Sequence, residues 1–167
     1  MPKWSFAHEG ITLTAHADTT AMTSGGFMAL KGGSATQRID VYEVYLGGLA
    51  AASAPTPALL GRSSTLGGTP TAITAPGSNE ALDPATAALA APQVAYFAAS
   101  TGPQRSTTLA KLALGFNAFG GLVRWVAAPG GEFKMLGNTA SLGEINIGAF
   151  TGGTPGLMNA HIHYETY

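Results

Sequence analysis

The residues best suited to chemistry lie close to the C-terminus and are His161, His163 and Glu165. Side chains on a β-strand alternate between its two faces, so in an extended segment these three point to one side, while Ile162 and Tyr164 point to the other. Two imidazoles and a carboxylate on one face form a donor set that binds transition metals such as non-haem iron. The spacing therefore marks a candidate metal site.

The same segment resembles the cupin motif, a glycine followed by His-x-His and then a glutamate, with Gly156 ahead of His161 and His163. Cupins place the glutamate farther beyond the second histidine and supply another histidine from a later strand. Here Glu165 comes two residues on, and the sequence stops at Tyr167. We therefore favour a polar strand with hydrogen-bonding histidines, expect no metal and no cofactor, and keep a cupin-like metal enzyme as the alternative.

Other catalytic patterns are missing from the sequence. There is no cysteine, which excludes thiolate zinc sites and cysteine nucleophiles. No serine lies in a G-x-S-x-G elbow, and the glycine-rich pieces have no lysine and following helix to hold a phosphate. We therefore expect a protein that is not an enzyme.

The chain is unusually poor in charge. Charged residues make up 10% of its 167 residues, against roughly 25% in an ordinary soluble domain. The net charge is −1 and the eight Lys and Arg are scattered, which argues against nucleic acid as a partner. No apolar window approaches the roughly 18 residues of a membrane span, so we expect no membrane partner either. So sparsely charged a surface indicates burial against other subunits.

Short apolar runs broken by Gly, Pro, Asn or Ser clusters run through the whole chain. This rhythm predicts an all-β fold, an antiparallel, jelly-roll-like β-sandwich forming one domain over residues 1–167. The predicted strands are residues 11–15, 27–30, 39–46, 58–60, 71–74, 94–98, 109–116, 122–127, 133–136, 145–150 and 161–165.

Residues 50–92 have a different texture, rich in Ala, Ser, Thr, Pro and Gly. Long loops inside compact domains are uncommon and often functional, so we expect an extended arm that wraps a neighbour. Within it, Asp83 and Pro84 precede an alanine-rich stretch that stops at Pro92. An acidic N-cap followed by proline predicts one short helix over residues 85–91.

Four residues are candidates for contacts between subunits. Trp4 and Phe6 lie in a polar segment, residues 1–10, which we expect to be an N-terminal tail that anchors its aromatic rings on a neighbouring subunit. Arg38 and Arg105 follow similar short motifs at the entrances of two predicted strands. Guanidinium groups at such positions bond carboxylates or carbonyls.

The C-terminal third carries a family resemblance, in Gly-Glu-Ile at residues 143–145, Phe-Thr-Gly-Gly-Thr-Pro-Gly at 150–156 and His-Ile-His-Tyr-Glu at 161–165. These segments and the texture of the chain resemble tailed-phage virion proteins, in particular jelly-roll capsid cement (decoration) proteins. The resemblance implies a small homo-oligomer, such as a homotrimer, on the outer capsid surface of the virion, where it binds adjacent major capsid protein subunits. A capsid, tail-tube or filament subunit remains a further alternative.

In such an oligomer, closed cyclic symmetry buries one apolar face of the sandwich between protomers. The predicted strands 39–46 and 122–127 are candidates for that face.

Overall fold

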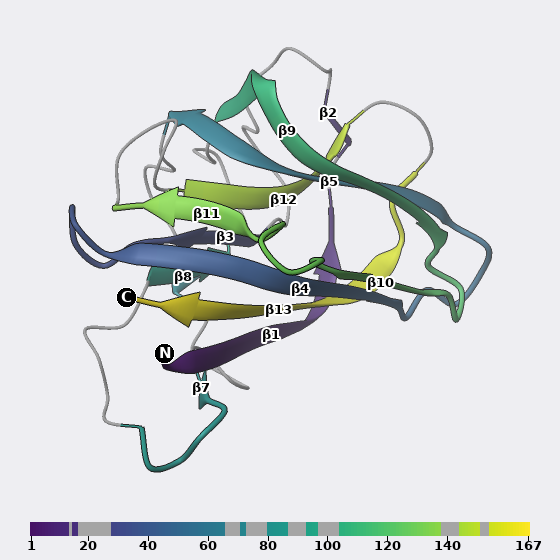
Figure 1. Ribbon diagram of the computed structural model, residues 1–167. Helices are drawn as coiled ribbons and strands as arrows, with labels where there is room; N and C mark the ends of the chain where they lie inside the picture. Colours follow the sequence, from purple (N-terminus) through teal and green to yellow (C-terminus); the bar gives the residue numbers. More distant parts are fainter. Residues whose placement is uncertain are drawn as a thin grey trace.

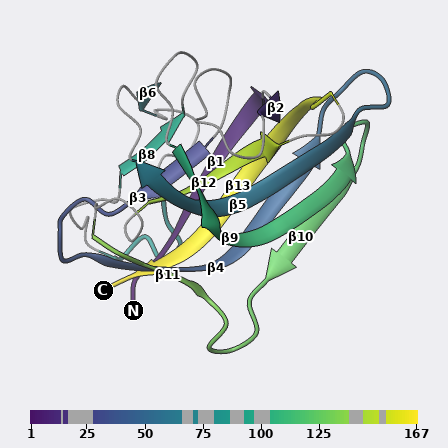
Figure 2. The ribbon, with the colours of Figure 1, turned by 90° about the horizontal axis from the view of Figure 1, so that it is seen from above.

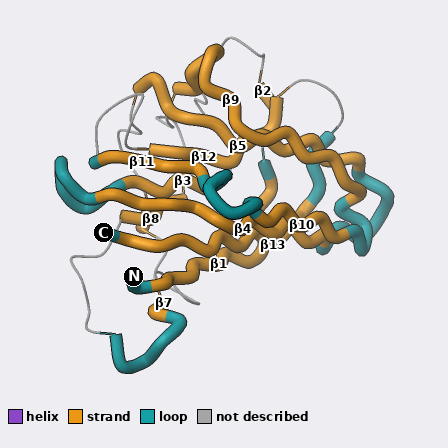
Figure 3. Tube along the Cα trace, in the orientation of Figure 1, coloured by secondary structure: helices purple, strands orange, loops and turns teal. Residues whose placement is uncertain are grey.

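The structure is a computed structural model, and it describes residues 1–13, 15–16, 28–65, 71–72, 80–86, 93–96, 104–137, 144–150 and 154–167. Over these residues the chain is β-strand joined by turns and loops, with no helix (Figure 3). Two sheets face each other and bury a common core (Figures 1 and 2). The predicted all-β sandwich is confirmed.

The strands fall into two sheets. The first has the order β10 (Leu122–Val126), β4 (Arg38–Gly48), β13 (Leu157–Thr166), β1 (Lys3–Thr12) and β7 (Glu80–Ala81), and β11 (Phe133–Leu136) pairs with the first half of β4. The second has the order β6 (Thr71–Ala72), β8 (Gln93–Tyr96), β3 (Met28–Lys31), β12 (Glu144–Phe150), β5 (Pro55–Thr65) and β9 (Gln104–Asn117). All these pairings are antiparallel, and β2 (Ala15–His16) adds a parallel contact to β12.

The path of the chain between the sheets gives the topology. It passes from β1 to β3, β4 and β5, changing sheet each time, then from β9 to β10 and from β12 to β13, changing sheet again. The eight main strands therefore form two layers, β1-β13-β4-β10 and β3-β12-β5-β9. This is the arrangement of a jelly roll, in which two Greek keys close on each other.

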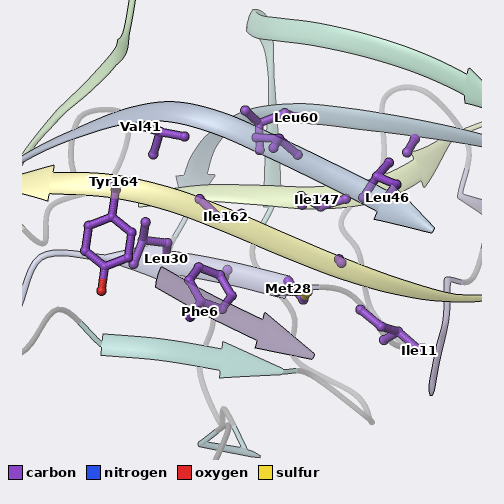
Figure 4. Close-up of a cluster of buried hydrophobic side chains, with 14 of the residues drawn as sticks. Phe6, Ile11, Met28, Leu30, Val41, Leu46, Leu60, Ile147, Ile162 and Tyr164 are labelled. Atoms are coloured by element: carbon purple, nitrogen blue, oxygen red, sulfur yellow. The ribbon is translucent and has the colours of Figure 1, made fainter. Parts of the chain in front are cut away.

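The core lies between these layers and is built by alternation along the central strands. In β13, Met158, Ala160, Ile162 and Tyr164 are buried, while the residues between them are partly exposed. Figure 4 shows side chains from both sheets meeting there, among them Phe6 of β1 beside Tyr164. Each large apolar side chain buried in this way contributes about 1.5–3 kcal/mol to stability.

The expected N-terminal tail over residues 1–10 is wrong, because most of that segment is strand β1. Trp4 and Phe6 are 4% and 0% exposed and belong to the core, so neither ring is available to a neighbouring subunit. Trp4 Nε1 also donates a hydrogen bond to Thr166 Oγ1 at 3.1 Å. The segment looks polar because its alternate residues face solvent, while pairing with β13 turns the aromatic rings inward.

The expected arm over residues 50–92 is also wrong for the part that forms β5, which pairs with both β12 and β9. The short strand predicted at residues 58–60 lies within β5, but the strand is longer than predicted and includes the buried Thr56. Residues 87–91 of the predicted helix lie outside the described residues. Its start is a turn, in which the N–H of Thr86 donates to the carbonyl of Asp83.

Candidate functional site

His161, His163 and Glu165 lie on the outer face of the first sheet, as the alternation predicts. All three are partly exposed, and the residues between them, Ile162 and Tyr164, point into the core. The histidines therefore face away from the apolar space between the layers. They form part of a polar surface over β10, β4, β13 and β1, which we call the outer face.

A β-bulge in β4 shapes this outer face. His163 lies opposite Glu43 and Tyr164 lies opposite Val41, so Tyr42 is an extra residue without its own partner in β13. The bulge places Tyr42 and Glu43 on the same side of the sheet, where both contact His163. The sequence carries a signal for it, because the apolar residues that are buried change from odd positions, Ile39 and Val41, to even positions, Val44 and Leu46.

Glu43 is the centre of a hydrogen-bonded cluster on the outer face. The residue is 6% exposed, and its carboxylate accepts a hydrogen bond from His163 Nδ1 at 2.9 Å and forms an ion pair with Arg124 of β10. The ring of His161 lies 4.4 Å from that of His163 and stacks on Tyr45 at 5.6 Å, measured between centroids. The cluster joins three neighbouring strands and satisfies a nearly buried charge.

The surroundings shift the pKa values of this cluster. Burial by itself raises the pKa of Glu43, but hydrogen bonds from His163, Arg124 and Tyr45 outweigh it, so the pKa is below its ordinary value. Burial lowers the pKa of His161, the charge of His163 lowers it further, and Glu43 opposes both effects. Near neutral pH, Glu43 is therefore ionised and His161 is neutral.

His161 also contacts a serine, a pairing that the sequence analysis missed because the two residues are far apart in the chain. Ser5 Oγ of β1 lies 2.5 Å from His161 Nε2. A serine and a neutral imidazole are two parts of a hydrolytic triad, but acyl transfer also needs N–H donors for an oxyanion. The backbone around Ser5 pairs with β13 on one side and β7 on the other. The pair therefore lies on a continuous sheet surface, and the described residues around it form no oxyanion hole.

The candidate metal ligands do not converge. Glu165 forms an ion pair with Lys3, whose Nζ lies 3.5 Å from Glu165 Oε1, while His163 turns towards Glu43. Among the described residues, no three His, Asp or Glu side chains are grouped so that they could hold a metal ion. His161 and His163 thus lie side by side without the third ligand that the sequence pattern offered.

Arg38 lies at the entrance of β4, as expected, and bonds a carboxylate. Its Nε is 3.5 Å from Asp40 Oδ1, and Lys134 Nζ lies 2.6 Å from Asp40 Oδ2. Arg38, Lys134 and Arg62 line a shallow cavity of about 230 Å³ at this end of the sandwich, together with Met135 and Leu136.

The other predicted arginine, Arg105, lies near the start of β9 in the second sheet. Its backbone is opposite Ser63 of β5, and its side chain lies outside the described part of the structure. The interface role that we predicted for Arg105 stays a prediction.

Large apolar side chains are exposed at many points of the described surface. Those that are at least 39% exposed are Met1, Leu49, Leu82, Phe119, Leu122, Val126, Leu136, Leu157 and Tyr167. The strand predicted to be an apolar contact surface, β10, exposes Leu122, Arg124 and Val126 on its outer side. Strand β4 is central in its sheet, and its apolar side chains are already covered by the core.

Comparisons with known protein families, with curated proteins and with solved structures found no match. In the described residues, no helix is long and apolar enough to cross a membrane. The outer face and the exposed apolar side chains are therefore the features of this chain that bear on its function.

Proposed function

We propose that this chain is a structural assembly subunit, a capsid cement (decoration) protein that associates with its own copies and with the major capsid protein on the outer surface of a phage virion. The observation that carries this proposal is the exposure of large apolar side chains, including Phe119 and Leu122, on a surface with few charges. Such side chains on a freely dissolved domain favour association, and in an assembly they are covered.

The chemistry of the outer face supports a contact surface over a catalytic one. The charges of the described face are paired within the molecule, as in Glu43 with Arg124 and Asp40 with Lys134. These paired charges stabilise the sheet and are therefore not available as nucleophiles or bases for a bound substrate. The flat face of tyrosines and histidines suits contact with another protein, because aromatic rings give large contact area at low cost in conformational entropy.

The jelly roll is compatible with this role and also with its alternatives. The same architecture serves viral capsid proteins, lectins and cupins, so the fold by itself selects none of them. A cupin-like metal enzyme needs converging ligands, and the histidines here lie on the outer face with Glu165 paired to Lys3. Assembly is therefore the function that the described geometry supports best.

The test is the location of the chain in its source culture. We expect an antibody against the purified chain to label the outside of intact virus particles in electron micrographs, and the chain to sediment with those particles. Regular knobs on a shell support a cement role, whereas label along a helical tube or filament supports a tube or filament subunit. A chain that remains in the supernatant while particles are unlabelled contradicts the proposal.

A metal analysis of the purified chain separates the proposal from the cupin-like alternative. We expect less than stoichiometric transition metal in the purified protein and in the double variant His161→Ala/His163→Ala alike. One bound metal per chain that disappears in the double variant would favour the enzyme.

A further inference from the structure

Three segments of the chain that meet at one end of the sandwich contain no charged side chain. Residues 44–61, 112–123 and 145–160 contain no Asp, Glu, Lys, Arg or His. The β4–β5 connection, the β9–β10 hairpin and the start of β13, which belong to these segments, meet at the right of Figure 1. We call this end the apolar tip; its exposed large side chains are Leu49, Phe119, Leu122 and Leu157.

Backbone hydrogen bonds between the three segments hold the apolar tip in one shape. The N–H of Leu49 donates to the carbonyl of Leu157, and the N–H of Ala50 donates to that of Ala118, both at 2.9 Å. The N–H of Ala118 donates in turn to the carbonyl of Ala54 at 2.9 Å. Loops that are fixed in this way lose little conformational entropy when a partner docks.

The side chain of Asn117 adds a second set of bonds at the apolar tip. Its Oδ1 accepts hydrogen bonds from the N–H groups of Ala54 and Phe119, both at 3.0 Å, and its Nδ2 donates to Ser53 Oγ at 2.9 Å. These bonds orient the hairpin that carries Phe119, whose side chain is 59% exposed. A rigid support beneath an exposed aromatic ring is typical of a contact hot spot.

We propose that the apolar tip is the surface through which a second copy of this chain docks, so that the oligomer closes around these ends. This inference rests on the proposed function, because it names the self-contact of the assembly subunit. Two copies related by symmetry bring identical surfaces together, and identical charges would repel. The three segments of the apolar tip contain no charged side chain, so their contact carries no such penalty.

The size of the apolar tip also fits a second copy. The four large side chains are between 39% and 70% exposed, and their neighbours at residues 51–53, 55, 117, 120 and 154 are exposed as well, so all of them can contribute to the roughly 800 Å² that each partner gives to a standard interface. A lipid surface is the less fitting occupant, since anionic membranes attract Lys and Arg, which these three segments lack.

The experiment measures the mass of the purified chain by sedimentation equilibrium over a range of concentrations. We expect the wild-type chain to form an oligomer. The double variant Phe119→Ser/Leu122→Ser should raise the dissociation constant of this oligomer by at least about tenfold, as truncation of hot-spot side chains does. The matched control is Leu136→Ser, which removes a 52% exposed leucine at the opposite end of the sandwich. Unchanged circular dichroism spectra and cooperative unfolding establish that the variants fold; the midpoint itself is expected to fall when an oligomer dissociates.

Three results overturn this inference. The first is a wild-type chain that stays a single copy up to on the order of 100 µM. The second is a tip variant that is as oligomeric as the Leu136→Ser control. The third is a single-copy chain that needs Phe119 and Leu122 to bind phosphatidylcholine vesicles or virus particles, which assigns the apolar tip to a membrane or to the shell. Particle labelling tests the proposed function separately, so the two can fail independently.

Discussion

Replacement of Phe6 by alanine tests directly whether the N-terminal segment belongs to the core. Phe6 is fully buried in β1 opposite Ile162, and its ring meets the edge of the Tyr164 ring at a centroid distance of 6.4 Å. Truncation therefore removes a whole aromatic side chain from a packed interior. If residues 1–10 were a free tail instead, the same substitution would leave the stability of the sandwich unchanged.

The expected magnitude follows from this burial. Truncation of a buried phenylalanine to alanine costs about 3–5 kcal/mol of the free energy of unfolding, because transfer energy is lost and a cavity remains. A domain of this size has in total about 5–15 kcal/mol. The loss corresponds to a decrease of the melting temperature by roughly 6–20 °C, at about 2–4 °C per kcal/mol for chains of this length.

The assay is urea unfolding followed by circular dichroism, with thermal unfolding as a second measurement. The control is Thr12→Ala on the same strand, where an exposed side chain is removed and the expected change is within about 0.5 kcal/mol. A loss for Phe6→Ala of less than about 1 kcal/mol would refute the placement of β1 in the core. It would also restore the interpretation of Trp4 and Phe6 as docking residues.

The other predictions concern the outer face and the apolar tip. The pKa of His161 in the folded chain is below its ordinary 6.5, so the unfolded chain binds the proton more readily and stability should fall as the pH drops below about 6.5. The pKa of Glu43 is below 4.5 in the folded chain, so stability should fall again below about pH 4.5. In urea unfolding at successive pH values, His161→Gln should reduce the first loss and Glu43→Gln the second; part of each remains, because the pKa values of His8 and Glu132 are also below their ordinary values. Gly48→Ala should cost about 1–3 kcal/mol in thermal unfolding, since a Cβ atom there collides with the carbonyl of Ala118, and an unchanged midpoint would contradict the tight packing of the tip. Ser5→Ala should leave hydrolysis of p-nitrophenyl acetate at the wild-type level, and a marked decrease would instead assign catalysis to the Ser5 and His161 pair.

The sequence predicted most strands well where apolar residues recur in short runs. Residues 133–136 match β11, and residues 39–46 lie within β4 (Arg38–Gly48). The prediction was weakest for β1 and β5, where polar or small residues alternate with buried ones. Burial of Thr56 and Trp4 depends on strands that pair from distant parts of the chain, which a local pattern does not contain.

The candidate site was predictable in part for the same reason. The shared face of His161, His163 and Glu165 follows from the period of two residues along a strand, and it is confirmed. The partners of these residues are not local, because Glu43, Ser5 and Lys3 lie more than 100 residues away in the sequence. Sequence spacing therefore located the donors but not what they bind.

By itself, the sequence determined that this chain is an all-β sandwich with few charges, because composition and the alternation of short apolar runs are local properties. The tertiary structure decided which residues meet. It turned Trp4 and Phe6 into the core, placed the histidines on the outer face, and gathered Leu49, Phe119 and their neighbours at one tip. These outcomes depend on long-range strand register, since a shift by one residue exchanges the two faces of a strand.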